Sequence, residues 1–128
     1  VGELYLSKVN KKVYVSDTIG FIQNLPSETI NAFESTLMET INADLLLHVI
    51  DISDKQMFDK INVVEGVLFN LGIDTKKQLY VFNKIDKPND VIKEDLLYNF
   101  DFFNPQFISA INGDGFPQLL TAIQKELF

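Results

Sequence analysis

Apolar and polar residues alternate over two short stretches near the start of the chain. Residues 4–6 and 13–15 show this alternation on either side of a turn-like Asn10-Lys11-Lys12. A period of two is typical of a half-buried strand, so the pattern predicts a hairpin whose second strand ends at Asp17. Ser27 then stands before apolar residues at helical spacing, which predicts a helix over 27–42 with Ser27 as its N-cap.

From residue 45 onward, continuous apolar runs alternate with helical patterns. Residues 45–52 and 78–86 are typical of strands buried on both faces, and residues 105–110 predict a last short strand. Helices are expected over 58–71, closed by Gly72, over 91–100 and over 116–127. This alternation predicts an α/β fold, a three-layer α/β/α sandwich with a mostly parallel sheet.

Composition narrows the class of protein. The chain has 128 residues, of which 46% are hydrophobic, the size of one globular domain. The absence of cysteine excludes a disulfide framework and a thiolate site. The longest apolar run, residues 45–50, is too short to span a membrane. A formal net charge of −7 argues against a broad binding surface for DNA or other nucleic acid.

Candidate chemistry gathers at the predicted strand ends. Ligands bind beyond the carboxyl ends of the strands in such sheets. Asp17-Thr18, Asp51, Asn83 to Asp86 and Ser109-Ala110 follow four different strands. We therefore expect these residues to meet at one rim of the sheet.

The residues after the second buried strand suit a guanine base. The Asp86 carboxylate can accept from the ring N1–H and the exocyclic amine of guanine, which adenine lacks in that arrangement. Asn83 can tie the neighbouring loops and touch the other edge of the base, and the aliphatic stem of Lys84 can lie along the ring. The backbone N–H of Ala110, next to Ser109, is expected to donate to the guanine carbonyl oxygen.

Asp17, Thr18 and Gly20 suit the other end of a nucleotide. Asp17 is expected to hold Mg²⁺ through a water, because magnesium keeps most of its waters in proteins. The Gly20 N–H can approach a terminal phosphate closely, since no side chain hinders it. Each motif alone is weak evidence for a nucleotide site. The order of the motifs along the chain makes that evidence strong.

Taken together, the sequence resembles HflX-type GTPases, of the translation-factor class of P-loop GTPases. The resemblance is carried by "DTIGFIQNLP", "AFESTLMET", "LLLHVIDISD", "NKID" and "ISAINGDG", and extends from about Val13 to the end of the chain. It implies a cytoplasmic protein whose full-length form hydrolyses GTP to GDP and binds the large ribosomal subunit. By motif match, Asp17, Thr18 and Gly20 correspond to the phosphate and magnesium switch. Asn83, Lys84 and Asp86 correspond to guanine recognition, and Ser109 with Ala110 to the loop that supports the base.

Two departures from the family pattern bear on catalysis. Phe21 stands where many GTPases place a glutamine that orients the attacking water, so no catalytic residue is assigned. No Gly-x-x-x-x-Gly-Lys-Ser/Thr occurs among the six glycines. We expect residues 1–128 to be the C-terminal portion of a single G domain, starting after the P-loop, its strand and its helix. The chain alone should then bind GTP or GDP weakly, and it should not hydrolyse GTP.

The missing strand predicts a rearranged sheet. In this fold it lies between the strand ending at Asp17 and the strand ending at Asp51. We expect either direct pairing of these two strands or strand exchange with another chain, because a free edge is an aggregation hazard.

Two other interpretations stay open at this point. A response-regulator receiver matches in length, acidity and the position of Asp51, but the order of its motifs differs. A non-catalytic interaction module would use Phe21, Ile22 and Leu25 as a partner surface. His48, in a buried run, is expected to be a packed core residue and not a general base.

Overall fold

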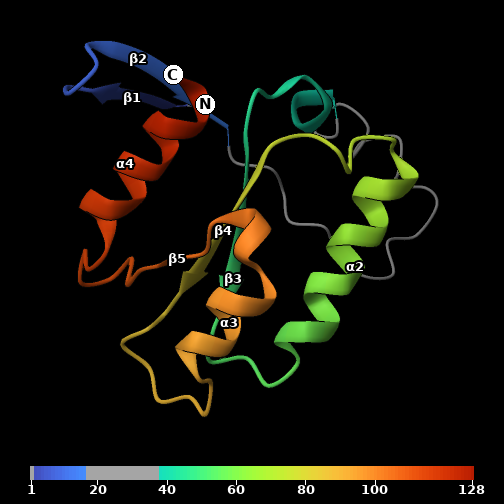
Figure 1. Cartoon of the computed structure of the whole chain (residues 1–128). Helices are drawn as coiled ribbons and strands as arrows, with labels where there is room; N and C mark the ends of the chain where they lie inside the picture. The colour runs from blue at the N-terminus through green and yellow to red at the C-terminus, as the bar shows by residue number, and fades with distance from the viewer. Residues whose placement is uncertain (1, 17–37) are drawn as a thin grey trace.

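Helices and strands alternate along most of the chain (Figure 1). The computed structural model describes residues 2–16 and 38–128. In chain order the elements are β1 (Gly2–Leu6), β2 (Lys11–Val15), β3 (Leu46–Asp51), α2 (Met57–Asn70), β4 (Gln78–Asn83), α3 (Lys93–Asn99), the 3-10 turn η1 (Asp101–Phe103), β5 (Gln106–Phe107) and α4 (Phe116–Leu127). Residues 38–42 are also helical. The helix start predicted at Ser27 lies outside the described residues.

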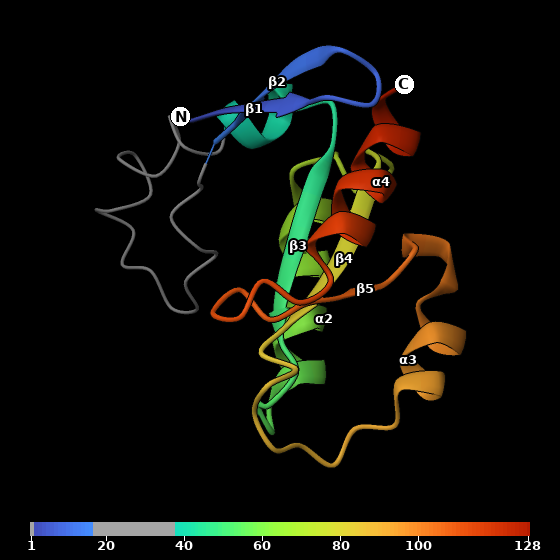
Figure 2. The same cartoon turned by 90° about the vertical axis from the view of Figure 1, so that its left-hand side faces the viewer.

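The main sheet is parallel and has the order β3-β4-β5. Strand β4 pairs with β3 from Gln78 opposite Leu46 to Asn83 opposite Asp51, and with β5 at two positions. Figure 2 shows the sheet with α4 on the near side and α2 behind it. The predicted α/β sandwich with a parallel sheet is confirmed, but the expectation that residues 45–52 are buried on both faces is wrong, since Leu47 and Val49 of β3 are exposed.

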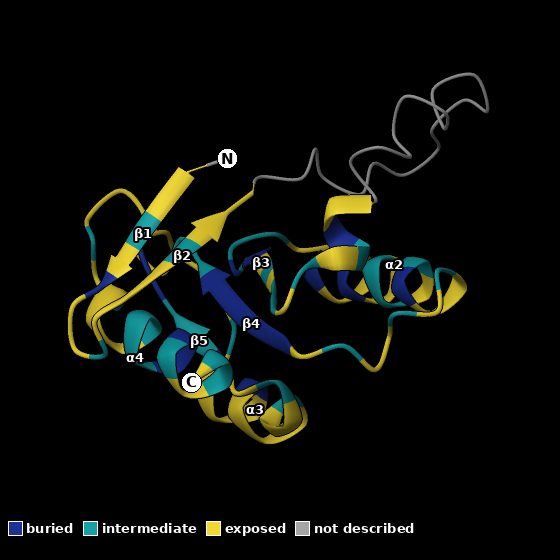
Figure 3. Cartoon of the chain, turned by 90° about the horizontal axis from the view of Figure 1, so that it is seen from above, coloured by how far each residue is buried: buried dark blue, intermediate teal, exposed yellow. Residues whose placement is uncertain are grey.

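The core lies on both faces of β4, which is the most buried strand (Figure 3). On one face, Tyr80 and Phe82 belong to a cluster that includes Ile61 of α2 and Leu96 of α3. On the other, Leu79 packs with Ile123 of α4 and with the hairpin. This double burial explains the uninterrupted apolar run in the sequence.

Helix α2 ends in a Schellman motif, as its glycine predicts. The Gly72 N–H donates to the Phe69 carbonyl and the Ile73 N–H to the Leu68 carbonyl, both at 3.0 Å. Gly72 has φ +73°, a conformation that glycine adopts without strain. The turn brings the chain back towards β4.

The hairpin does not join the main sheet in the described part of the chain. Strands β1 and β2 pair antiparallel, with Gly2 opposite Val15 and Leu6 opposite Lys11, and form a separate two-stranded sheet. Its apolar side packs on α4 and Leu79 instead, through Leu6, which is 2% exposed. Direct pairing of the hairpin's second strand with β3, one of the two predicted arrangements, is therefore wrong for the described residues, and strand exchange with another chain stays a prediction.

Candidate functional site

The carboxyl ends of β3, β4 and β5 meet at one rim. The Ile52 N–H donates to the Asn83 carbonyl at 3.0 Å, and the Ile85 N–H donates to the Ile108 carbonyl at 3.2 Å. These bonds extend the sheet past its last paired residues and bring together three of the four predicted strand ends. Asp17, Thr18, Gly20 and Phe21, predicted for the fourth, lie outside the described residues.

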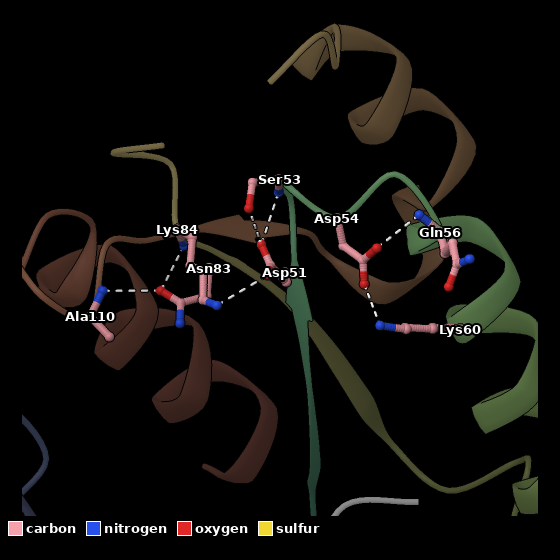
Figure 4. Close-up of polar contacts among 8 residues, drawn as sticks. All are labelled: Asp51, Ser53, Asp54, Gln56, Lys60, Asn83, Lys84 and Ala110. Carbon is pink, nitrogen blue, oxygen red and sulfur yellow. Dashed lines mark hydrogen bonds and ion pairs between the residues drawn. The ribbon is translucent and has the colours of Figure 1, made fainter. Parts of the chain in front are cut away.

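Asn83 ties two loops together at this rim (Figure 4). Its Oδ1 accepts from the Lys84 N–H at 2.7 Å and from the Ala110 N–H at 3.0 Å. The Asn83 side chain therefore links the loops that contain Lys84 and Ala110, as predicted. The Ala110 N–H, predicted to donate to a base carbonyl, is bonded to Asn83, so a base would have to share or displace that bond.

Asp86 is exposed but anchored through one oxygen. Ser109 is fully buried, and its hydroxyl donates to Asp86 Oδ1 at 2.8 Å while accepting from the Asn112 N–H at 3.2 Å. No donor in ranges 2–16 and 38–128 is hydrogen-bonded to Asp86 Oδ2. The carboxylate is therefore held in place with an oxygen left for a ligand. Sequence reasoning placed Ser109 at the rim and missed this contact with Asp86.

The loop after β5 depends on a glycine whose role the sequence did not reveal. Gly115 has φ +81°, and a Cβ on it would lie 2.1 Å from the Phe107 carbonyl oxygen. The N-terminus of α4 thus passes directly over β5. Gly113 has φ +82° too, but a Cβ there would meet nothing within 4 Å. The glycine-rich motif signals a turn, whereas the close approach at Gly115 follows from tertiary packing.

Lys84 is held by an acidic residue from the neighbouring strand. Its Nζ lies 3.1 Å from Asp51 Oδ2. Asp51 Oδ1 accepts from the Ser53 hydroxyl at 2.6 Å and from the Ser53 N–H at 2.9 Å. The Ser53 hydroxyl, followed by the Lys84 ammonium, lowers the pKa of Asp51 below its ordinary value, so the carboxylate is ionised at neutral pH. The sequence placed Asp51 at a strand end but gave no sign of its pairing with Lys84.

Asp54 follows Asp51 in the same loop and makes different contacts. It accepts from the Gln56 N–H at 2.8 Å and pairs with Lys60 of α2. The N-cap of α2 is Gln56, so neither Asp51 nor Asp54 caps this helix. Asp54 closes the turn before the helix instead.

His48 is packed away from the rim. Its side chain is 11% exposed, and its ring meets Tyr80 edge-on with centroids 4.8 Å apart. Burial lowers the pKa of His48 to about 4, so the ring is neutral at pH 7. This agrees with the predicted packing role.

Neither a metal cluster nor a membrane helix occurs in the described ranges. Within 2–16 and 38–128, no three His, Cys, Asp or Glu side chains are grouped so that they could hold a metal ion. The same residues include no helix of sufficient length and apolar character to cross a membrane. The predicted magnesium residue, Asp17, falls in the part not described.

The chain is similar in sequence to several known proteins. No family model matches the chain. It is 45% identical over 118 residues to GTPase HflX of Caldanaerobacter subterraneus, which is 92% of this chain and 26% of that protein. It is 38% identical over 113 residues to GTPase HflX of Escherichia coli, 88% of this chain and 26% of the relative. The Magnetococcus marinus GTPase HflX is 37% identical over 115 residues, 89% of this chain and 26% of the relative. The chain therefore spans about a quarter of the length of these relatives.

Proposed function

This chain is a segment of an HflX-type GTPase, and on that premise we propose that residues 1–128 are the C-terminal portion of one G domain that binds guanine nucleotides. The base-binding half of the site consists of Asn83, Lys84, Asp86, Ser109 and Ala110. In this proposal GTP and GDP are the ligands.

One observation carries this proposal: the buried Ser109 hydroxyl holds the exposed Asp86 carboxylate. An anchored carboxylate whose second oxygen accepts no hydrogen bond from the described residues can accept from the N1–H and the amine of guanine, whereas adenine would leave it unpaired. Sites built on buried polar groups reject a ligand that lacks the partner by about 10⁴-fold, and a smaller preference is expected here because water can solvate the exposed Asp86 carboxylate. Asn83 supports the arrangement, because it fixes the Lys84 and Ala110 loops on either side.

The phosphate half of the proposed site consists of Asp17, Thr18 and Gly20, with Mg²⁺ held by Asp17 through a water. The printed sequence contains no Gly-x-x-x-x-Gly-Lys-Ser/Thr motif to wrap the phosphates. Charge-assisted hydrogen bonds contribute roughly 1.5–3 kcal/mol each, so this chain alone should bind nucleotide weakly. It should not hydrolyse GTP at a measurable rate.

In the full-length protein, the proposed activity is hydrolysis of GTP to GDP on the large ribosomal subunit, in the cytoplasm. Phe21 has no hydrogen-bonding group with which to orient the attacking water. Intrinsic hydrolysis should therefore be slow, and the water should be positioned from outside this chain.

Titration calorimetry of the chain with GDP and Mg²⁺, beside ADP, tests the proposal. We expect weak binding of GDP and none of ADP, because ADP cannot pair with Asp86. Equal binding of both nucleotides would show that the rim does not read guanine. No binding of either, even at millimolar concentration, would favour the alternative of an interaction module with a degenerate site.

A further inference from the structure

A second acidic residue, Asp51, stands beside the proposed base site without belonging to its predicted residues. It ends β3, in register with Asn83 of β4. Its Oδ2 lies 3.1 Å from the Nζ of Lys84, and the two side chains are 34% and 40% exposed. The pair joins residues 33 positions apart in the sequence across the rim.

Asp51 is itself held in one orientation. Both the hydroxyl and the backbone N–H of Ser53 donate to its Oδ1, at 2.6 and 2.9 Å. These two bonds leave Oδ2 for the Lys84 ammonium (Figure 4). A carboxylate fixed in this way gives a lysine side chain a defined end point, whereas a lysine on its own samples many rotamers.

Lys84 is also held at its backbone. Its φ is +69°, a left-handed conformation that is uncommon for a residue with a long side chain. The Asn83 side chain accepts from its N–H at 2.7 Å and stabilises that conformation. Backbone and ammonium are thus fixed separately, and the apolar stem between them is drawn from the end of β4 towards β3.

We infer that Asp51, oriented by Ser53, is a positioning residue for the guanine site: it holds the Lys84 stem in the place where the ring of the base lies on it. This inference rests on the proposed function. It assigns to Asp51 an effect on affinity for the base, while Asp86 sets the preference for guanine over xanthine.

The test compares Asp51→Asn with Asp54→Asn as a matched control. Both remove one carboxylate from the same loop, but Asp54 pairs with Lys60 of α2 and does not contact Lys84. GDP and xanthosine diphosphate are titrated into ¹⁵N-labelled chain, and affinities are taken from the amide shifts of Ser109 and Ala110. We expect Asp51→Asn to weaken GDP binding by about 2- to 5-fold, within the range for an exposed ion pair, and Asp54→Asn to leave it unchanged.

A double mutant separates positioning from general support of the fold. In a Lys84→Met background, Asp51→Asn should have no further effect on GDP affinity, because its partner ammonium is gone. The ratio of GDP to xanthosine diphosphate affinities should stay at the wild-type value in Asp51→Asn. A purely structural role would weaken binding in both backgrounds.

The outcomes distinguish the inference from the function on which it rests. If wild-type chain binds GDP and Asp51→Asn binds it equally well, the positioning role is wrong and the guanine site stands. If Asp51→Asn weakens binding as strongly with methionine at position 84, the effect does not pass through Lys84 and the inference is likewise overturned. If the wild-type chain binds no GDP, the proposed function fails for this chain and the inference fails with it.

Discussion

Gly115 and Gly113 offer a matched pair for testing how the loop after β5 is held. Both residues have left-handed φ, +81° and +82°, so alanine at either position is strained. They differ in surroundings: a Cβ on Gly115 would lie 2.1 Å from the Phe107 oxygen and 3.2 Å from the Ile108 Cα, whereas a Cβ on Gly113 meets nothing within 4 Å.

The expected losses follow from this difference. Left-handed backbone costs an L-residue roughly 1–2 kcal/mol, which is the whole effect expected for Gly113→Ala. At Gly115 the Cβ must also move about 1 Å away from a backbone oxygen in a close-packed region. We expect Gly115→Ala to lower the free energy of unfolding by roughly 3–4 kcal/mol, among the large values that backbone strain and overpacking produce together.

Urea unfolding followed by far-UV circular dichroism measures both variants, since the chain has no tryptophan. The amide shifts of Ser109 and Ala110 should move further in Gly115→Ala than in Gly113→Ala, although the Gly113 N–H donates to the Ser109 carbonyl at 2.7 Å. Equal losses of stability in the two variants would refute the reasoning, because conformational strain alone would then account for both. Intact Ser109 and Ala110 shifts in Gly115→Ala would show that the contact with β5 does not position the loop.

Three further predictions concern single side chains. His48 is the chain's one histidine, and burial lowers its pKa to about 4. The unfolded state therefore binds the proton more readily, and stability should fall by roughly 2 kcal/mol between pH 7 and pH 4.5. Unfolding curves of His48→Gln should lack this loss, and the same slope in both chains would contradict the assignment. Asn83→Ala should cost about 1–2 kcal/mol in urea unfolding, because it leaves the two N–H groups that Asn83 accepts from without a partner; an unchanged midpoint would contradict it. Tyr80→Phe should cost about 1 kcal/mol, because the Tyr80 hydroxyl donates to Glu65 at 2.6 Å; a gain in stability on thermal unfolding would show that this bond contributes nothing.

Much of the fold could be predicted from the sequence, because the buried faces of helices and strands carry apolar residues at regular spacing. The run at 78–83 is apolar on both faces since β4 has helices on each side, and α4 has the bounds that its spacing predicted. Gly72 marked the end of α2 because few other residues adopt its conformation. The meeting of Asn83 and Ser109 at one rim followed from the rule for parallel strands.

The remaining features depend on contacts between segments that are distant in the sequence. The spacing of apolar and polar residues along the chain does not predict such contacts. The Asp51–Lys84 pair joins two strands, and no spacing along the chain predicts it. The close approach at Gly115 depends on how α4 crosses β5. The packing of Leu6 on α4 joins the two ends of the chain. Each of these depends on tertiary packing.

The central claim is that Asp86, held by Ser109, reads the guanine base, and Asp86→Asn tests it most directly. An asparagine amide can donate to the second carbonyl of xanthine, which replaces the guanine amine that the carboxylate accepts from. In a titration of ¹⁵N-labelled chain with Mg²⁺ present, we expect wild type to prefer GDP over xanthosine diphosphate and Asp86→Asn to reverse that preference. A variant that gains affinity for one nucleotide cannot be explained by loss of folding. Retained preference for GDP in Asp86→Asn would contradict the account.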